Sequence, residues 1–161
     1  MNAYTIIHVI ISLIAIFAGI VVMFGMLGGK KCDKWATFFM VMTAATSLTG
    51  FGFIRHHIMP AHIVGIISLV VLAITAIAFY VFRLGGMWRK TYVIGAVVSL
   101  YLNVFVLIVQ AFLKIPAFHK LAPTQTEFPF KLAQGWVLVF FVLLGALALI
   151  RFQPSQKTSR K

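Results

Sequence analysis

The first apolar stretch of the chain reads TIIHVIISLIAIFAGIVVMFGML and covers residues 5–27. It contains no Asp, Glu, Lys or Arg. About twenty apolar residues, at ~1.5 Å of helical rise each, match the ~30 Å hydrocarbon core of a bilayer. This stretch therefore predicts a helix that crosses a membrane.

Four further stretches share that length and apolar character: residues 35–54, 61–82, 92–113 and 132–150. Of all 161 residues, 62 % are hydrophobic and 10 % are charged, whereas a soluble domain carries about 25 % charged residues. This composition excludes a soluble globular protein. It predicts an all-α, polytopic membrane protein in which residues 1–161 form a single transmembrane domain of five helices.

The basic residues indicate how these helices are oriented. With the N-terminus outside, ten of the fourteen Lys and Arg residues fall in the loops 28–34 and 83–90 and in the tail 151–161, all cytoplasmic. The outer segments keep only Arg55, Lys114, Lys120 and Lys131. Because cytoplasmic loops carry an excess of Lys and Arg, the pattern predicts an outer N-terminus and a cytoplasmic C-terminus.

The net charge of +12 is distributed over these short segments. A nucleic-acid-binding protein would instead gather basic residues on one helix or face. We therefore interpret the charge as a signal for topology and expect no nucleic acid as a partner. The expected partner is the lipid bilayer, and Lys30, Lys31 and the tail can contact its anionic lipids.

Two segments of the chain echo one another. Residues 10–13 and 66–69 both read Ile-Ile-Ser-Leu, and each precedes a glycine pair, at 28–29 and 85–86, that ends the helix. The echo fits a tandem repeat of two helical hairpins followed by one added helix. Chance similarity between apolar segments explains it equally well.

Polar residues gather toward the outer half of the predicted bundle. The candidate ligand-binding residues are His8, His62, Asn103, Gln110, Glu127 and Gln134. Asn103 lies near the centre of its helix, where an amide needs a partner on another helix. The outer loop 114–131 is too apolar to remain solvated, so we expect it to fold onto the helix ends. Such a fold would bring Glu127 near Arg55, Lys131 or an outer histidine and cover a polar pocket.

Several chemistries compete for these residues. Haem b between membrane helices needs two imidazoles at similar depth, and His8 with His62 is the best pair. A zinc site could draw on His56, His57, His62 and Glu127, but no known ligand spacing is present, so we predict no metal site. His8 and Ser12 lack an acid to orient the histidine, so we predict no enzyme activity. Both acids, Asp33 and Glu127, lie outside the spans, which argues against proton-coupled transport.

Several segments carry a resemblance to a known family. They are TGFGF at 49–53, HIVGIISL at 62–69 and YLNVFV at 101–106, followed by KIPA at 114–117 and LAPTQTE at 121–127. Together they resemble a group of small, uncharacterised bacterial inner-membrane proteins. The resemblance covers most of the chain and implies a bacterial origin, an inner-membrane location and a helical fold, but no activity. Ile54 and Arg55 depart from it, because a Phe-Pro turn ends the second helix in that group.

From these observations we expect a non-enzymatic inner-membrane protein that binds a small ligand or a lipid at its outer face. An accessory subunit of a larger membrane complex, or a homo-oligomer, fits the same features. The alternatives are a redox protein linked to haem b or a quinone, and a pH-responsive element that uses the outer histidines. The sequence identifies no cofactor.

Overall fold

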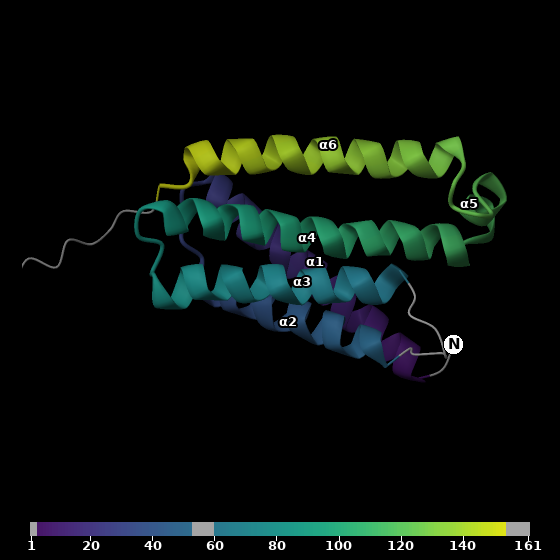
Figure 1. Cartoon of the computed structure of the whole chain (residues 1–161), viewed down its shortest axis with the longest axis horizontal. Helices are drawn as coiled ribbons and strands as arrows, with labels where there is room; N and C mark the ends of the chain where they lie inside the picture. The colour runs from purple at the N-terminus through teal and green to yellow at the C-terminus, as the bar shows by residue number, and fades with distance from the viewer. Residues whose placement is uncertain (1–2, 53–59, 154–161) are drawn as a thin grey trace, which may run out of the picture.

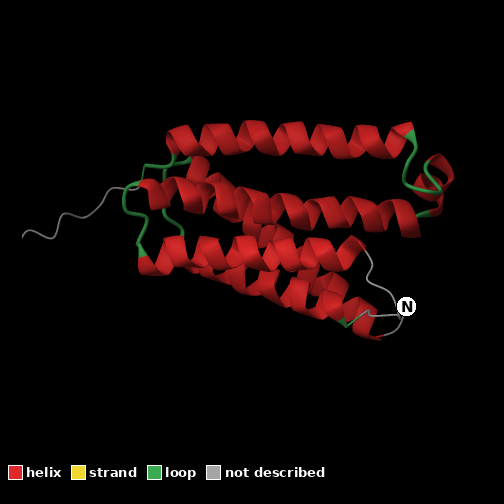
Figure 2. Ribbon diagram, viewed as in Figure 1, coloured by secondary structure: helices red, strands yellow, loops and turns green. Residues whose placement is uncertain are grey.

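The computed structural model describes residues 3–52 and 60–153. All regular structure in this part of the chain is helical. The elements in chain order are α1 (Ala3–Leu27), α2 (Asp33–Phe51), α3 (Pro60–Ala76), the π-helix η1 (Ile77–Val81) that continues α3, α4 (Met87–Lys114), α5 (Pro116–Leu121) and α6 (Phe128–Arg151). Figures 1 and 2 show the long helices side by side, with α1 and α2 inclined to the others.

Four helical segments are long and apolar enough to cross a membrane: Ala3–Leu27, His62–Val81, Met87–Lys114 and Phe128–Arg151. The prediction of an all-helical protein with membrane-spanning helices is therefore confirmed for four of the five expected spans. The remaining helix, α2, is less apolar because it carries Asp33 and Lys34 in its first turn and several hydroxyl residues beyond it. The end of its expected span, at residue 54, lies outside the described residues.

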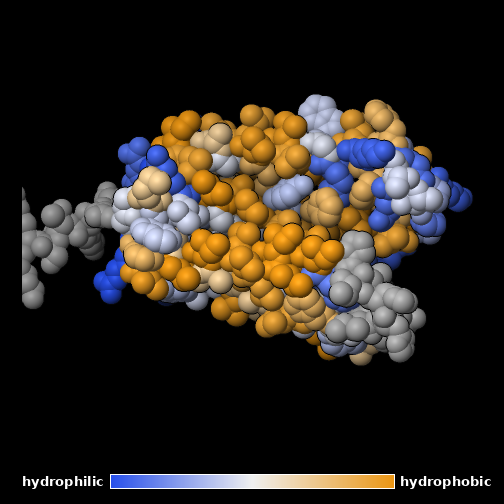
Figure 3. Space-filling view, viewed as in Figure 1, coloured by the Kyte–Doolittle hydropathy of each residue, from blue (hydrophilic) through white to orange (hydrophobic). Residues whose placement is uncertain are grey.

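Apolar side chains cover the outside of the bundle. Phe24, Phe128, Trp136 and Ile150 are each more than two-thirds exposed. On the face that Figure 3 shows, apolar side chains form a hydrophobic belt across the middle of the molecule, with hydrophilic residues gathered toward the ends. In water such a surface would aggregate, whereas in a bilayer it faces the acyl chains.

Small residues let the helices approach closely inside the belt. A Cβ atom at Gly19 of α1 would lie 2.6 Å from Leu100 Cδ1 of α4 and 2.8 Å from Phe39 Cε2 of α2. A Cβ atom at Gly95 of α4 would collide with the Thr75 hydroxyl group of α3. Close backbone approach at small residues is a main source of packing energy between membrane helices.

One end of the bundle, which we call the basic end, carries the turns 28–32 and 82–86. The first turn follows the glycine pattern expected from the sequence. Gly29 has φ +69°, and Lys30 N donates to Gly25 O at 2.8 Å, as in a Schellman cap. The second turn differs, because Arg83 and Leu84 take left-handed φ values of 45° and 62° ahead of Gly86. Leu84 tolerates this conformation because its side chain is buried in the core.

The other end, which we call the α5 end, contains the start of α1 and the loop between α4 and α6 (Figure 1). The expected loop 114–131 is shorter than predicted, because α5 forms within it and α6 begins at Phe128. Pro129 lies in the first turn of α6, where a backbone N–H has no partner within the helix. Proline has no N–H, so it breaks no helical hydrogen bond at this position. Similarly, α4 begins at Met87, ahead of the expected residue 92.

Candidate functional site

At the α5 end, the first turn of α1 packs closely on the last turn of α2. The Tyr4 hydroxyl group donates a hydrogen bond to the Thr49 carbonyl oxygen. It lies directly over Gly52, where any Cβ atom would collide with it. Glycine at this position is therefore required for the observed contact between α1 and α2.

His8 lies one turn further along α1 and contacts the same end of α2. Its Nδ1 atom lies 2.7 Å from Thr49 Oγ1, and that hydroxyl oxygen lies 2.7 Å from the Ala45 carbonyl oxygen. A threonine hydroxyl has one proton, which we assign to the bond with Ala45 because a carbonyl can only accept. His8 Nδ1 must then carry a hydrogen and donate it to Thr49. In the neutral imidazole this assignment leaves the lone pair on Nε2.

His62 of α3 also contacts this end of α2. It is 9 % exposed, and its ring stacks on Phe51 with centroids 6.0 Å apart and an interplanar angle of 10°. The Phe51 ring in turn lies 3.3 Å from the Cβ position of Gly65 on α3. The structure thus brings His8 of α1 and His62 of α3 to one helix end, and we call His8, Thr49, Phe51 and His62 the histidine group.

The side-chain amide of Asn103 forms a hydrogen bond inside the bundle. Its Nδ2 atom donates to Thr43 Oγ1 of α2 at 3.2 Å, and both residues are buried. The prediction that Asn103 faces the interior and bonds another helix is confirmed.

Gln134 joins α6 to α4. Its Nε2 atom donates to the Phe105 carbonyl oxygen at 3.2 Å, while its buried Oε1 atom has no hydrogen-bond partner among the described residues. Gln110, on the same helix as Phe105, is half-buried. No hydrogen bond between described residues links Gln110 or Gln134 to the histidine group.

The connection between α4 and α6 folds onto the helix ends, as expected. Gln125 Nε2 donates to the Val109 carbonyl oxygen of α4 at 2.9 Å. Phe112 of α4 stacks with Phe118 of α5 and meets Phe130 of α6 edge-on, with centroids 5.4 Å and 5.3 Å apart. Aromatic contacts of this kind hold the loop against the bundle.

The carboxylate of Glu127 is bonded by the loop that carries it. Its carboxylate accepts hydrogen bonds from Thr124 N at 3.1 Å, Thr124 Oγ1 at 2.9 Å and Thr126 N at 3.0 Å. Desolvation works against ionisation, but these hydrogen bonds outweigh it and lower the pKa of Glu127 below its ordinary value. No ion pair joins Glu127 to Lys131 among the described residues, because the loop itself satisfies the carboxylate. That Glu127 lies near an outer histidine stays a prediction. The other expected partner, Arg55, lies outside the described residues, as do His56 and His57.

A second candidate site lies at the basic end and was not anticipated from the sequence. It is an open cleft of about 710 Å³ between the start of α2 and the end of α3 with η1. Its lining residues are Lys31, Asp33, Lys34, Thr37, Phe79, Tyr80 and Arg83. The sequence indicates a topology signal in these basic residues and a lipid contact at Lys31, but no cleft, because the π-helix that positions the two aromatic residues leaves no mark in the hydrophobic pattern.

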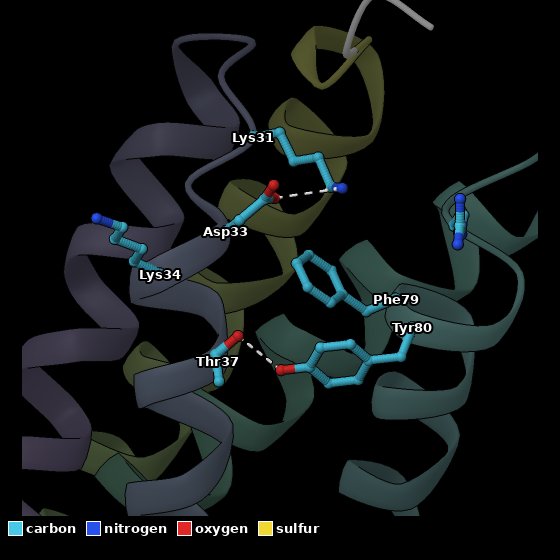
Figure 4. A pocket seen from close by; sticks show the side chains of 7 residues that line it. Lys31, Asp33, Lys34, Thr37, Phe79 and Tyr80 are labelled. Atoms are coloured by element: carbon cyan, nitrogen blue, oxygen red, sulfur yellow. Dashed lines mark hydrogen bonds and ion pairs between the residues drawn. The ribbon is translucent and has the colours of Figure 1, made fainter.

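Hydrogen bonds and ring contacts organise this cleft (Figure 4). The Tyr80 hydroxyl group donates to Thr37 Oγ1 at 2.6 Å, which joins η1 to α2. Lys31 Nζ lies 3.3 Å from Asp33 Oδ1 and 4.9 Å from the centre of the Phe79 ring. Phe79 and Tyr80 therefore form an aromatic wall of the cleft, and Asp33 partly neutralises the charge of Lys31 beside it.

Metal binding finds no support in the part of the chain that the structure describes, where no group of three His, Cys, Asp or Glu side chains could hold an ion. Comparison with protein-family models, with curated proteins and with solved structures found no match for this chain.

Proposed function

We propose that this chain is a non-enzymatic bacterial inner-membrane protein that binds a lipid or another small ligand at its outer face, through the histidine group. In this proposal the α5 end is the outer face and the basic end is cytoplasmic, in accordance with the positive-inside rule. The protein can act alone, as a homo-oligomer or as an accessory subunit of a larger membrane complex.

Contacts at both ends of α2 support a fifth span. Tyr4 of α1 bonds Thr49 near the C-terminus of α2, and Tyr80 of η1 bonds Thr37 near its N-terminus. Because α1 and the α3–η1 segment are both candidate spans, these contacts support the proposal that α2 crosses the membrane beside them. Two of its hydroxyl groups bond to backbone carbonyls within the helix, Thr46 to Met42 O at 2.9 Å and Thr49 to Ala45 O at 2.7 Å, which lowers the cost of burying them.

The observation that carries the binding proposal is the hydrogen bond between His8 Nδ1 and Thr49 Oγ1. It fixes the ring orientation and places the hydrogen on Nδ1, which makes Nε2 the hydrogen-bond acceptor of the histidine group. Ammonium and hydroxyl groups can donate to such an acceptor. A phosphatidylethanolamine headgroup offers N–H donors at this depth, whereas phosphatidylcholine, whose nitrogen is fully methylated, offers none.

Lipid preference tests the proposal. We expect the purified wild-type protein to retain phosphatidylethanolamine over phosphatidylcholine in native mass spectrometry, and His8→Phe to lose that preference. His119→Phe is the matched control, because His119 is exposed on α5. Equal preference in wild type and His8→Phe would refute the proposal.

Haem b is the second candidate function, and the same bond favours it. A histidine that ligates a metal through one nitrogen usually donates a hydrogen bond from the other, as His8 does to Thr49. His62 would supply the second imidazole from α3. An absorbance spectrum of the purified protein, taken after addition of haemin and reduction with dithionite, separates the two functions. Low-spin haem held by two histidines gives sharp α and β bands, and these bands should disappear in His8→Phe.

A further inference from the structure

The cleft at the basic end lies at the level where the membrane spans end. The candidate span His62–Val81 ends beside it, and the next span begins at Met87. Tyr80 and Phe79 belong to the last turn of that span, while Lys31 and Arg83 follow the ends of apolar helices. A cleft at this depth faces lipid headgroups on one side and acyl chains on the other.

Three basic side chains and one acidic side chain line the cleft. Asp33 pairs with Lys31, and the ammonium group of Lys34 extends from the far side of α2 (Figure 4). Arg83 is exposed, and its guanidinium group makes no hydrogen bond or ion pair with the described residues. By contrast Arg89, on the same end, already donates to the Leu149 carbonyl oxygen at 3.2 Å. The lining therefore keeps a net positive charge and an uncommitted guanidinium group.

The backbone around Arg83 is fixed in an uncommon conformation. Arg83 and Leu84 both have positive φ, and the π-helix η1 precedes them. Leu84 N donates to Ala78 O at 3.1 Å, and the buried Leu84 side chain anchors the turn. Left-handed non-glycine residues and π-helices both occur preferentially at functional sites. Here they hold Arg83 at the mouth of the cleft and direct Tyr80 toward Thr37.

We propose that this cleft binds the phosphate group of an anionic membrane phospholipid, with Arg83 as the principal contact and Lys31 as the second. Arginine presents a planar fork of donors that matches phosphate oxygens. The aromatic wall made by Phe79 and Tyr80 then contacts the glycerol and the first methylene groups. A soluble phosphate compound is disfavoured, because two of the seven lining residues, Phe79 and Tyr80, belong to the end of a candidate membrane span. The proposal concerns a different site from the histidine group and does not depend on it.

Native mass spectrometry of the full chain with phosphatidylglycerol tests this site. Loss of charge-assisted hydrogen bonds worth ~1.5–3 kcal/mol weakens binding by about tenfold or more, and we expect Arg83→Gln to show such a loss. Lys90→Gln is the matched control, because Lys90 is exposed on the same end and does not line the cleft. We expect this control to bind within about twofold of wild type. Equal losses in the two variants would mean that general surface charge attracts the lipid, and the proposal would be wrong.

A loss of binding in Arg83→Gln could also result from misfolding, so a second variant is chosen that should bind the lipid more tightly. Asp33→Asn removes the only carboxylate of the lining and releases Lys31 from its ion pair. Phosphatidylglycerol should therefore bind to this variant several-fold more tightly than to wild type. No gain in Asp33→Asn would contradict the role of Lys31. Glycerol 3-phosphate is a soluble phosphate compound without acyl chains. If it displaces phosphatidylglycerol from the cleft at millimolar concentration, the cleft is a soluble phosphate site and the lipid assignment is wrong.

Discussion

Asn103 Nδ2 of α4 donates a hydrogen bond to Thr43 Oγ1 of α2 at 3.2 Å, across the buried interior of the bundle. A side-chain amide in this position needs a partner, because neither lipid nor the neighbouring apolar residues can accept its hydrogens. The bond ties the least apolar long helix to the helix that contacts most of the others.

Replacement of Asn103 by Leu should destabilise the bundle without blocking its insertion. Hydrogen bonds between membrane helices are worth ~0.6 kcal/mol on average and up to ~1.7 kcal/mol. Unfolding in mixed detergent micelles measures the change, with Thr43→Val as the partner variant. A double-mutant cycle that gives purely additive effects would show that the two side chains do not interact.

The tight contact at Gly52 gives a second prediction. In Gly52→Ala the new Cβ atom must displace the Tyr4 hydroxyl group and break its bond to Thr49 O. We expect a loss of about 1 kcal/mol in unfolding free energy, the value of one such hydrogen bond. Gly135→Ala is the control, because nothing lies within 4 Å of its Cβ position. That change should leave stability equal or raise it by ~0.5–1 kcal/mol, since Ala favours a helix interior. Similar losses at both positions would exclude the specific contact.

Topology can be tested with reporter fusions. Alkaline phosphatase joined after Arg151 should be inactive, because the basic end is expected to be cytoplasmic, and a fluorescent protein at the same place should fluoresce. Phosphatase joined after Lys120, in α5, should be active. The reverse pattern of activities would mean that the bundle is inserted the other way round.

Glu127 should titrate below the ordinary range of glutamate. Hydrogen bonds from Thr124 and Thr126 favour its charged form, so its folded-state pKa is lowered. A lowered pKa stabilises the folded loop at pH values above the unfolded-state pKa, and this contribution disappears as pH falls through the folded-state pKa. The amide resonances of Thr124 and Thr126 report the titration in NMR spectra. A midpoint at or above that of an unstructured glutamate would contradict the observed bonding, and Glu127→Gln should abolish the transition.

The features that could be predicted from the sequence follow from the bilayer as a solvent. The apolar spans, the interior position of Asn103 and the folded loop between α4 and α6 all follow from one cost. A polar group exposed to lipid, or an apolar group exposed to water, raises the free energy of the folded protein. The turn at Gly29 could also be predicted from local rules, because glycine adopts the positive φ that ends a helix more readily than other residues. These predictions needed no knowledge of which helices are neighbours.

The cleft could not be predicted in this way. Lys31, Tyr80 and Arg83 are brought together by the packing of α2 against η1, and nothing in the apolar pattern marks a π-helix. Arg83 and Leu84 even take the conformation that local rules would give to Gly85. For the same reason the sequence indicated that His8 is polar and near the membrane surface, but not that Thr49 would determine which of its nitrogens carries the proton.

The hydroxyl-rich character of α2 has a consequence for how the protein is made. A segment with Asp33 and Lys34 in its first turn and threonines along its length has little drive to partition into lipid on its own. Its polar groups are satisfied by helices on either side, through the bonds of Thr37, Thr43 and Thr49. We therefore expect α2 to enter the bilayer as a hairpin with α1, whose strongly apolar sequence supplies the missing free energy. In a translocon assay α2 alone should fail to integrate, whereas residues 1–52 together should integrate, and efficient integration of α2 by itself would exclude this order of assembly.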